Sequence, residues 1–412
     1  MSHPQTLQIP FPEFMLSIPT IQDSSQKLQL EHEKSQFSCN SHKKIVPLQP
    51  NCKNQNQMQL KGISLFSCIG VSEYYLHEVG VDIVVASDID PKRCNVHKFL
   101  YPDCEMICGD ITQNDTKQQI INAANKHEID LIISTPPCQG MSTVGKNKGC
   151  ALADAKDERN YLIIESFAII DKLAPKYIIF ENVPQLLKVN IPFDGKMLPV
   201  LDILKFKYGK EYNIKCDVFN CCNYGVPQSR ERVFIRLYKK GLNWVEPQKV
   251  FPITTLKDAI GDLPSLEPGE SSNIKNHWAR KHPQNQIDWL RHTPTGCSAF
   301  HNKDHFPVKA NGDRVKGYPN CYKRMVWDLP SPTITMRNEI MSSQDKVHPG
   351  RPLGNGKWSD ARVLTLRELL IIMSLPADLD LPTNVTDTAL RQYIGEGIPS
   401  LMMRKIIEGI VC

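Results

Sequence analysis

A short apolar run that stops at two prolines constrains this chain more than any other feature. Residues 129–134 read Ile-Asp-Leu-Ile-Ile-Ser, and Pro136 and Pro137 follow after one threonine. A β-branched run of this length with an abrupt end predicts a buried strand. Because each proline fixes φ and lacks an N–H, the turn after the strand is stiff. We therefore expect a parallel strand of an α/β fold, with Cys138 just beyond its carboxyl end.

Cys138 is the first candidate functional residue, because open α/β sheets place their active sites at this end of their strands. A thiol on a stiff turn suits a nucleophile better than a core residue. The alternative is a packed loop cysteine, since free cysteine often behaves as a small hydrophobic residue.

Two further motifs follow the same logic. The apolar segment Lys176–Phe180 leads into Glu-Asn-Val at 181–183, again at a predicted strand end. Farther on, Gln228, Arg230 and Arg232 alternate with other residues, and this period of two predicts that all three project to one face. A row of charges on an edge strand is the alternative for the arginines.

In the order Pro-Cys-Gln, Glu-Asn-Val, Gln-x-Arg-x-Arg, these motifs resemble those of the C5-cytosine-specific DNA methyltransferase family of the bacterial restriction–modification type. The resemblance runs from about residue 62 to the C-terminus. It implies an α/β fold with a doubly wound, mostly parallel, Rossmann-like sheet and a second, smaller target-recognition domain. It also implies S-adenosyl-L-methionine as cofactor and double-stranded DNA as partner. We expect a monomer that is paired in function, without a required physical complex, with a restriction endonuclease.

Composition agrees with a globular protein of this kind. Of the 412 residues, 41% are hydrophobic and 23% charged, and no apolar run approaches the length of a membrane span. The N-terminus lacks the basic-then-apolar pattern of a signal peptide, so we predict a cytoplasmic, DNA-associated protein without membrane contact. The 14 cysteines are scattered and lack zinc-finger spacing, which favours reduced thiols.

The chain is predicted to divide into four segments. Residues 1–60 contain ten glutamines and little hydrophobic periodicity, which favours a flexible extension of unknown role. We expect a catalytic, cofactor-binding domain over 61–240 and a small target-recognition domain with its framing segment over 241–385. Residues 386–412 are predicted to form a C-terminal helix that returns to the catalytic domain.

The segment after residue 62 has the pattern of a nucleotide-binding unit. A strand breaks into a turn at Gly70, a helix is predicted from about Ser72 to Val79, and a strand over Val81–Asp88 ends in an acid. Asp88 lies 18 residues after Gly70, close to the spacing at which such units present a carboxylate to a ribose. A third segment ends at Asp110. Helix N-capping is the alternative for either acid.

The resemblance assigns the cofactor contacts residue by residue. Phe66 matches the aromatic residue that packs on the adenine, Asp88 the acid at the ribose, and Asp110 the residue near the adenine amine. The predicted cofactor-binding set is Phe66, Gly70, Asp88, Ile89, Asp110, Ile111, Pro137, Leu162 and Glu396.

Three residues depart from the family pattern. Cys68 and Val71 stand where glycines are usual, so either the turn avoids positive φ there or its backbone is displaced from the methionine moiety. Glu396 stands in place of an asparagine whose amide contacts the methionine part of the cofactor. A carboxylate so close to the cofactor's own carboxylate is repulsive unless its pKa is raised or it pairs with the amino group.

The implied chemistry gives the motif residues separate roles. Cytosine C5 is a poor nucleophile until a thiolate adds at C6, so Cys138 is the predicted nucleophile. A carboxyl with a raised pKa can hydrogen-bond N3, and Glu181 is the candidate, with a helix-capping or surface acid as the alternative. By resemblance, Arg232 reaches the cytosine O2 and Arg230 supports the neighbouring loop or a phosphate.

DNA contacts are predicted in two regions. The target base must be flipped out of the duplex, and Gln139 and Ser142 match family positions that meet the DNA as the loop after Cys138 closes. In residues 271–324, ten basic residues stand against three acids, with five histidines and six aromatic residues between them. This composition fits phosphate contact and base-edge reading, with a solvated basic surface as the alternative. The predicted DNA-binding set is Gln139, Ser142, Gln228, Arg280, Arg291, Arg314 and Arg324.

No metal is predicted, because no cysteine or acid completes a set with His301 and His305. Two other functions stay open. A catalytically silent DNA-binding relative is opposed by the presence of Cys138, Glu181 and both arginines. A tRNA cytosine methyltransferase is opposed by the long basic segment.

Overall fold

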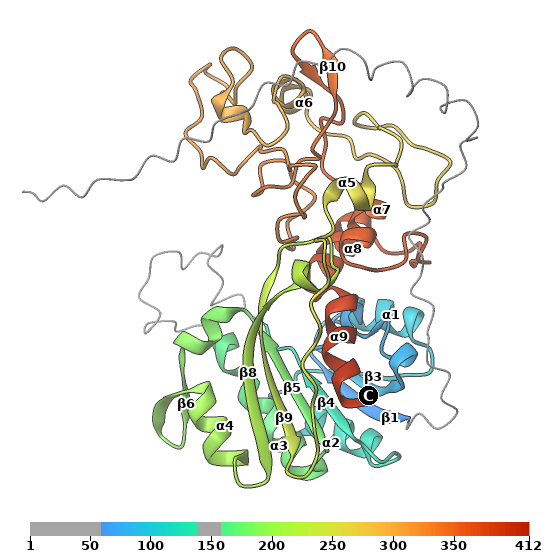
Figure 1. The fold of residues 1–412 in the computed structure, drawn as a ribbon, viewed down its shortest axis with the longest axis vertical. Helices are drawn as coiled ribbons and strands as arrows, with labels where there is room; N and C mark the ends of the chain where they lie inside the picture. The colour runs from blue at the N-terminus through green and yellow to red at the C-terminus, as the bar shows by residue number, and fades with distance from the viewer. Residues whose placement is uncertain (1–58, 138–157, 412) are drawn as a thin grey trace, which may run out of the picture. The chain divides into compact units, whose positions relative to one another are not determined.

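A seven-stranded sheet in the order β3-β2-β1-β4-β5-β9-β8 organises the computed structural model, which describes residues 59–137 and 158–411 (Figure 1). Neighbouring strands are parallel from β3 to β5, whereas β9 is antiparallel to both β5 and β8. The predicted α/β fold with a mostly parallel sheet is therefore confirmed. The strands are β1 Leu60–Leu65, β2 Val81–Asp88, β3 Glu105–Cys108, β4 Leu131–Ser134, β5 Tyr177–Asn182, β8 Tyr212–Asn220 and β9 Glu231–Lys239.

Both faces of the sheet are covered by helices. Alternate residues of β4, such as Ile132 and Ile133, enter two different apolar cores. One core includes α2 (Asn114–Ala124), α3 (Glu165–Leu173) and α4 (Val200–Tyr208), and the other includes α9 (Ser400–Val411). Helix α1 (Pro91–Leu100) packs on β2 and β3. A strand buried on both faces needs apolar residues at every position, which explains the unbroken apolar runs in the sequence.

The prediction of a helix from about Ser72 to Val79 is wrong. Two 3₁₀ turns, η1 (Val71–Glu73) and η2 (His77–Val79), take its place, with hydrogen bonds from Leu76 N to Glu73 O and from Val79 N to Leu76 O. All three residues of η1 are buried. An α-helix with one exposed face does not suit three consecutive buried residues, whereas a tight turn does. A further 3₁₀ segment, η4 (Glu158–Ile164), directly precedes α3.

Residues between β9 and α8 contain little regular structure. Two further apolar cores hold this part, and the larger joins Leu256, Leu369 and Ile394 to Ile69 and Val71 of the turn after β1. The helices here are α5 Leu256–Ile260, α6 Gln284–Arg291, α7 Leu366–Ile372 and α8 Asp387–Glu396. The other short elements of this part are η7 Ala299–His301, β10 Pro352–Gly354 and β11 Lys357–Trp358. Between β5 and β9 the structure also has η5 Pro184–Lys188, β6 Asn190–Phe193, β7 Lys196–Pro199 and η6 Cys221–Tyr224.

The described residues all lie within one compact unit, residues 56–412. The predicted boundaries inside that unit, at 240 and 385, stay predictions. Across the two described ranges, no helix combines the length and the apolar character that a bilayer crossing requires. The nine cysteines within those ranges are all free thiols.

Candidate active site

A cavity of about 880 Å³ opens where β1, β2, β4 and β5 reach their carboxyl ends and β9 begins. This is the edge at which open α/β sheets bind ligands, and the volume suits a ligand of nucleotide size. Most of the predicted cofactor-binding and catalytic residues line it together. They are Phe66, Asp88, Ile89, Asp110, Ile111, Pro137, Leu162, Glu181, Arg230, Arg232 and Glu396.

Gly70 does not line this cavity but shapes the turn beside it. Its φ is +78°, and an added Cβ would lie 2.3 Å from the ring of Tyr101, whose hydroxyl donates to Gly70 O at 2.6 Å. Of the two alternatives for the turn, avoidance of positive φ is contradicted at Cys68, where φ is +53°. A non-glycine residue in this region costs on the order of 1–2 kcal/mol, so neighbouring contacts must hold the turn.

Asp88 supplies one of those contacts and also binds the N-cap residue of α1. Its Oδ2 accepts a hydrogen bond from Cys68 N and its Oδ1 accepts one from Asp90 N, both at 3.0 Å. The carboxylate therefore fixes the turn after β1 and the start of α1 while it lines the cavity. Each of its oxygens keeps lone-pair capacity for a ribose hydroxyl.

The neighbouring residues suit an adenine ring. Ile89 is 62% exposed although it is a large apolar residue, and it faces the cavity with Phe66. Hydrogen bonds from Thr112 hold the pKa of Asp110 below its usual value, so this acid is ionised and can accept a hydrogen bond from an amine. Exposed apolar surface beside two carboxylates favours contact with an adenosine group over exposure to solvent.

Glu181 and Arg232 face each other at the other end of the lining. Arg232 Nε lies 3.1 Å from Glu181 Oε1, and both side chains are largely buried. Burial raises the pKa of Glu181, while Arg232 and Arg230 oppose that rise. The contact lacks hydrogen-bond alignment, and within the described ranges Oε1 has no hydrogen-bond partner. A buried oxygen with unused capacity favours a bound polar group at this point.

Arg230 and Asn182 hold the loops around this pair. Arg230 donates to Ile334 O at 2.6 Å and to Glu396 O at 3.3 Å, which fits the predicted supporting role. Asn182 donates from Nδ2 to Pro136 O at 3.0 Å and so ties the end of β5 to the loop after β4. Asn182 is a site residue that sequence reasoning missed, although the Glu-Asn-Val motif around it is a signal that could have indicated its role.

The predicted nucleophile Cys138 and the predicted DNA contacts Gln139 and Ser142 lie outside the described residues. The described chain ends on this side at Pro137, which lines the cavity with Pro136.

The predicted DNA contact of Gln228 is contradicted, because its side chain is fully buried. Its Oε1 accepts from Ile334 N at 3.1 Å, and its Nε2 lies 3.1 Å from Met373 Sδ. The period-two argument failed here because β9 begins only at Glu231. Gln228 pairs instead with Ser331 in an isolated bridge.

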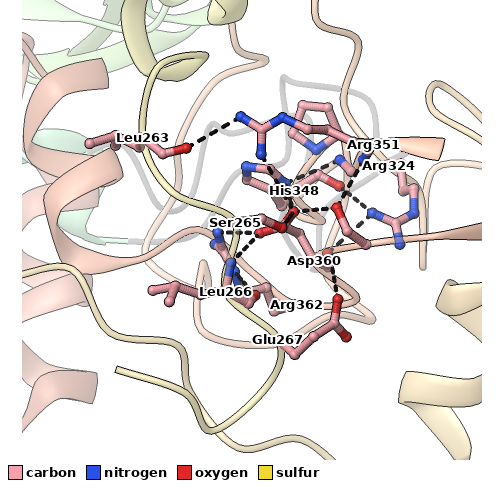
Figure 2. Close-up of polar contacts among 12 residues, drawn as sticks. Leu263, Ser265, Leu266, Glu267, Arg324, His348, Arg351, Asp360 and Arg362 are labelled. Atoms are coloured by element: carbon pink, nitrogen blue, oxygen red, sulfur yellow. Dashed lines mark hydrogen bonds and ion pairs between the residues drawn. The ribbon is translucent and has the colours of Figure 1, made fainter. Parts of the chain in front are cut away.

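Arg324 is also buried, with an exposed fraction of 0%, so a DNA contact from its side chain is contradicted. Its guanidinium donates to the carbonyl oxygens of Leu290, His348 and Asp360, and burial lowers its pKa to about 9. Figure 2 shows this guanidinium in a polar cluster with His348, Asp360 and Arg362. The cluster joins segments that few regular elements connect, so Arg324 holds the fold of this part.

The other three predicted arginines differ in exposure. Arg280 contacts Asp387 and Thr388 of α8, and Arg291 lies 2.8 Å from Glu267, so both have protein partners. Arg314 is exposed; its Nη2 donates to Phe300 O and its guanidinium carbon lies 4.0 Å from the centre of the Phe306 ring. DNA contacts of these three stay predictions.

The sequence suggested His301 as the partner of His305, whereas the structure brings Asp288 and His292 to His305. Asp288 Oδ2 lies 2.6 Å from His305 Nδ1, and His292 stacks on His305 with ring centres 3.5 Å apart and 14° between planes. The ligand atoms of these three residues lie within 4.8 Å of one another. A ring nitrogen's lone pair lies in the ring plane, however, so two nearly parallel stacked rings cannot direct theirs at one ion.

Arg93 is a site residue that sequence reasoning missed. It lies on α1, lines the cavity and contacts Glu396, the residue that replaces the family's asparagine. Its Nη2 is 2.8 Å from Oε2 and 3.0 Å from Oε1 of that carboxylate. No periodicity or motif marks Arg93, because the contact joins segments 303 residues apart.

Two solved structures are similar in fold over most of this chain. The Entamoeba histolytica methyltransferase EhMeth has a TM-score of 0.58 at 16% identity, covering 86% of this chain and 98% of its own. A mutant of Spodoptera frugiperda DNMT2 has a TM-score of 0.51 at 20% identity, covering 84% and 99%. At these identities the likeness supports the fold alone.

Two curated relatives have higher sequence identity to this chain than these two structures have. Type II methyltransferase M1.HgaI of Avibacterium volantium is 46% identical over 351 residues, covering 85% of this chain and 98% of the relative. Type II methyltransferase M1.HphI of Haemophilus parahaemolyticus is 28% identical over 358 residues, covering 86% and 87%. The model of the C-5 cytosine-specific DNA methylase family matches residues 60–412. This chain therefore belongs to the C-5 cytosine-specific DNA methylase family.

Proposed function

We propose that this enzyme transfers a methyl group from S-adenosyl-L-methionine to C5 of a flipped cytosine in a specific duplex DNA sequence. One observation carries the proposal. The buried Glu181–Arg232 pair and the predicted adenosine-binding residues Asp88, Ile89 and Asp110 line a single cavity. A methyl donor and an acceptor base can therefore occupy one continuous space.

The chain's residues divide the work of activating the base. The Cys138 thiolate attacks C6 and forms a carbon–sulfur bond, and the C5–C6 π electrons pass toward N3 and O2. Glu181 donates a hydrogen bond to N3, for which a carboxyl with a raised pKa is suited. Arg232, 3.1 Å from Glu181, places a positive charge at O2. The negative charge that addition creates is thereby held in the ring, and C5 becomes nucleophilic.

When bound, S-adenosyl-L-methionine would supply an electrophilic methyl group on a positively charged sulfur, and loss of that methyl group would leave the sulfur as a neutral thioether. Asp88 and Asp110 are the residues that would hold its ribose and adenine, with Ile89 and Phe66 against the ring. The exposed apolar surface of Ile89 and the carboxylates beside it fit this group. After transfer, loss of the C5 proton to a base expels the Cys138 thiolate and restores the aromatic ring.

We further propose that the enzyme acts in the cytoplasm as a monomer and protects DNA from a cognate restriction endonuclease. The names of the relatives, both Type II methyltransferases, support this role over a tRNA substrate or a catalytically silent relative. Arg314, exposed in the basic segment 271–324, supports contact with the DNA backbone.

The test uses duplex DNA that contains 5-fluorocytosine. The fluorine cannot leave as the C5 proton does, so the wild-type enzyme should form a denaturant-stable adduct with DNA in the presence of the cofactor. Cys138→Ser should lose the adduct and most turnover while it still binds DNA. Transfer of labelled methyl groups to DNA but not to tRNA, followed by bisulfite mapping, identifies substrate and position. An equal adduct yield from Cys138→Ser, or transfer to tRNA alone, would overturn the proposal.

A further inference from the structure

The contact between Arg93 and Glu396 lies inside the cavity and not on the protein surface. Arg93 stands in the first turn of α1, shortly after Asp88, and Glu396 is the last residue of α8. Their side chains are 23% and 15% exposed, and both line the cavity with Cys68 and Asp88. A bound ligand can therefore reach both charged groups.

Negative charge exceeds positive charge at this point. Around the Arg93 guanidinium, Asp88 Oδ1 lies at 4.0 Å, Asp90 Oδ2 at 3.7 Å and Glu396 Oε2 at 2.8 Å. Three carboxylates thus share one cation in a partly buried space. Burial raises the pKa of Glu396 while Arg93 opposes the rise, as expected for a carboxylate that lacks sufficient positive charge.

Hydrogen-bonding capacity is also unused. Only Nη2 of Arg93 donates to Glu396, and within the described ranges its buried Nε has no hydrogen-bond partner. The Glu396 carboxylate accepts from Arg93 and lies 3.6 Å from Cys68 Sγ, which leaves further lone pairs for a donor. The pair can therefore accept one cationic group and one anionic group at the same time.

We propose that Arg93 and Glu396 form a receptor for the amino-acid end of the cofactor, with Glu396 accepting from the α-ammonium and Arg93 donating to the α-carboxylate. This inference rests on the cofactor named under Proposed function and deepens it. Asp88 lies next to Arg93, so the amino-acid end would follow the ribose along the cavity wall. The arrangement also explains how a carboxylate is tolerated in place of the family's asparagine. Arg93 shields the cofactor's carboxylate from Glu396, and Glu396 gains the ammonium.

The test compares three ligands by titration calorimetry with the full chain. S-adenosylmethionine and S-adenosylhomocysteine carry the amino-acid end, whereas 5′-methylthioadenosine lacks it. Arg93→Ala should weaken the first two by about tenfold or more and change 5′-methylthioadenosine by less than about twofold. Lys92→Ala, which removes the exposed neighbouring charge on α1, should leave all three affinities unchanged.

A double variant gives the sharper result. Arg93→Ala leaves Glu396 to repel the cofactor's carboxylate, so adding Glu396→Gln should recover part of the lost affinity. Arg93→Lys, which keeps the charge, should bind the full cofactor better than Arg93→Ala, and it carries the test if Arg93→Ala does not fold. Thermal unfolding checks each variant.

Two results would overturn the proposal, and they differ. If wild type binds none of the three ligands, the cofactor assignment fails and this inference fails with it. If wild type binds them but Arg93→Ala weakens 5′-methylthioadenosine as much as the others, the pair maintains the shape of the cavity and does not bind the amino-acid end.

Discussion

Arg232 Nε lies 3.1 Å from Glu181 Oε1, although the two residues are 51 positions apart in the chain. The antiparallel pairing of β9 with β5 produces this contact, because Glu181 pairs with Phe234 and Asn182 with Val233. The start of β9 therefore reaches the same sheet edge as the end of β5. A parallel β9 would begin at the opposite edge, and its first arginines would lie far from Glu181.

Replacing Glu181 should impair catalysis more than binding. Glu181→Ala removes the proposed hydrogen bond to N3, so kcat should fall about 100-fold or more, while the Kd for the cofactor stays unchanged. Glu181→Gln keeps a donor and should retain more activity than alanine. Single-turnover methyl transfer measures the first effect and calorimetry the second. A kcat near that of wild type for Glu181→Ala would rule out the N3 role.

Replacing Asp88, in contrast, should impair cofactor binding more than catalysis. Asp88→Ala removes the proposed ribose contact and the acceptor for Cys68 N, so cofactor binding should weaken by on the order of 1–3 kcal/mol. DNA affinity should change little. Asp82→Ala, at the other end of β2, serves as the matched control. Equal cofactor affinities of Asp88→Ala and wild type in calorimetry would contradict the assignment.

Arg324→Ala should destabilise the protein and leave site preference unchanged. The substitution leaves the carbonyl groups of Leu290, His348 and Asp360 without their donor in a buried place. We expect a loss on the order of 3–5 kcal/mol in the free energy of unfolding, measured by denaturant titration. A stable variant with altered sequence preference would show instead that Arg324 reads DNA.

Arg314→Ala should leave stability unchanged and weaken DNA binding. Arg314 is exposed and uses only Nη2 for carbonyl contacts, so its other donors can reach a phosphate. Affinity should fall for all sequences, and the slope of log affinity against log salt should decrease by about one. Lys196→Ala, an exposed charge on β7, controls for net charge. An unchanged slope would place Arg314 outside the DNA interface.

Stability should fall in mild acid because of His348. Burial and the nearby Arg362 lower the pKa of His348 to about 4. The unfolded chain, with a histidine pKa of about 6.5, takes up the proton first. The stability that neutral, buried His348 contributes to the folded state is therefore complete above pH 6.5. It is lost as pH falls toward 4, which lowers the free energy of unfolding by on the order of 3 kcal/mol. His348→Asn, which keeps an acceptor for Gly350 N, should show a shallower loss in unfolding measured across this range. Parallel curves for variant and wild type would exclude His348 as the cause.

Sequence patterns predicted the strands and the catalytic edge because both depend on local chemistry. Apolar runs such as 129–134 end where β4 ends, and both the acid that ends β2 and the acid that follows β3 reach the cavity. Contacts between distant segments had no such signal. Gln228 and Arg324 read as DNA contacts by composition, but tertiary packing buries both. Arg93 meets Glu396 only because α8 returns to α1, which no local pattern encodes.

Helix α9 has a consequence for the order of folding. Its Met402, Ile406 and Ile407 fill the core on one face of the sheet, against Leu131 and Ile133 of β4. During synthesis, β1 to β9 are made first, and the part of this core that α9 fills stays open until residues 400–411 emerge. Domains generally fold as units, so this sheet must wait for α9 with part of an apolar face exposed. A nascent chain that stops before α9 is therefore expected to depend on chaperones, whereas the finished chain can bury that face itself.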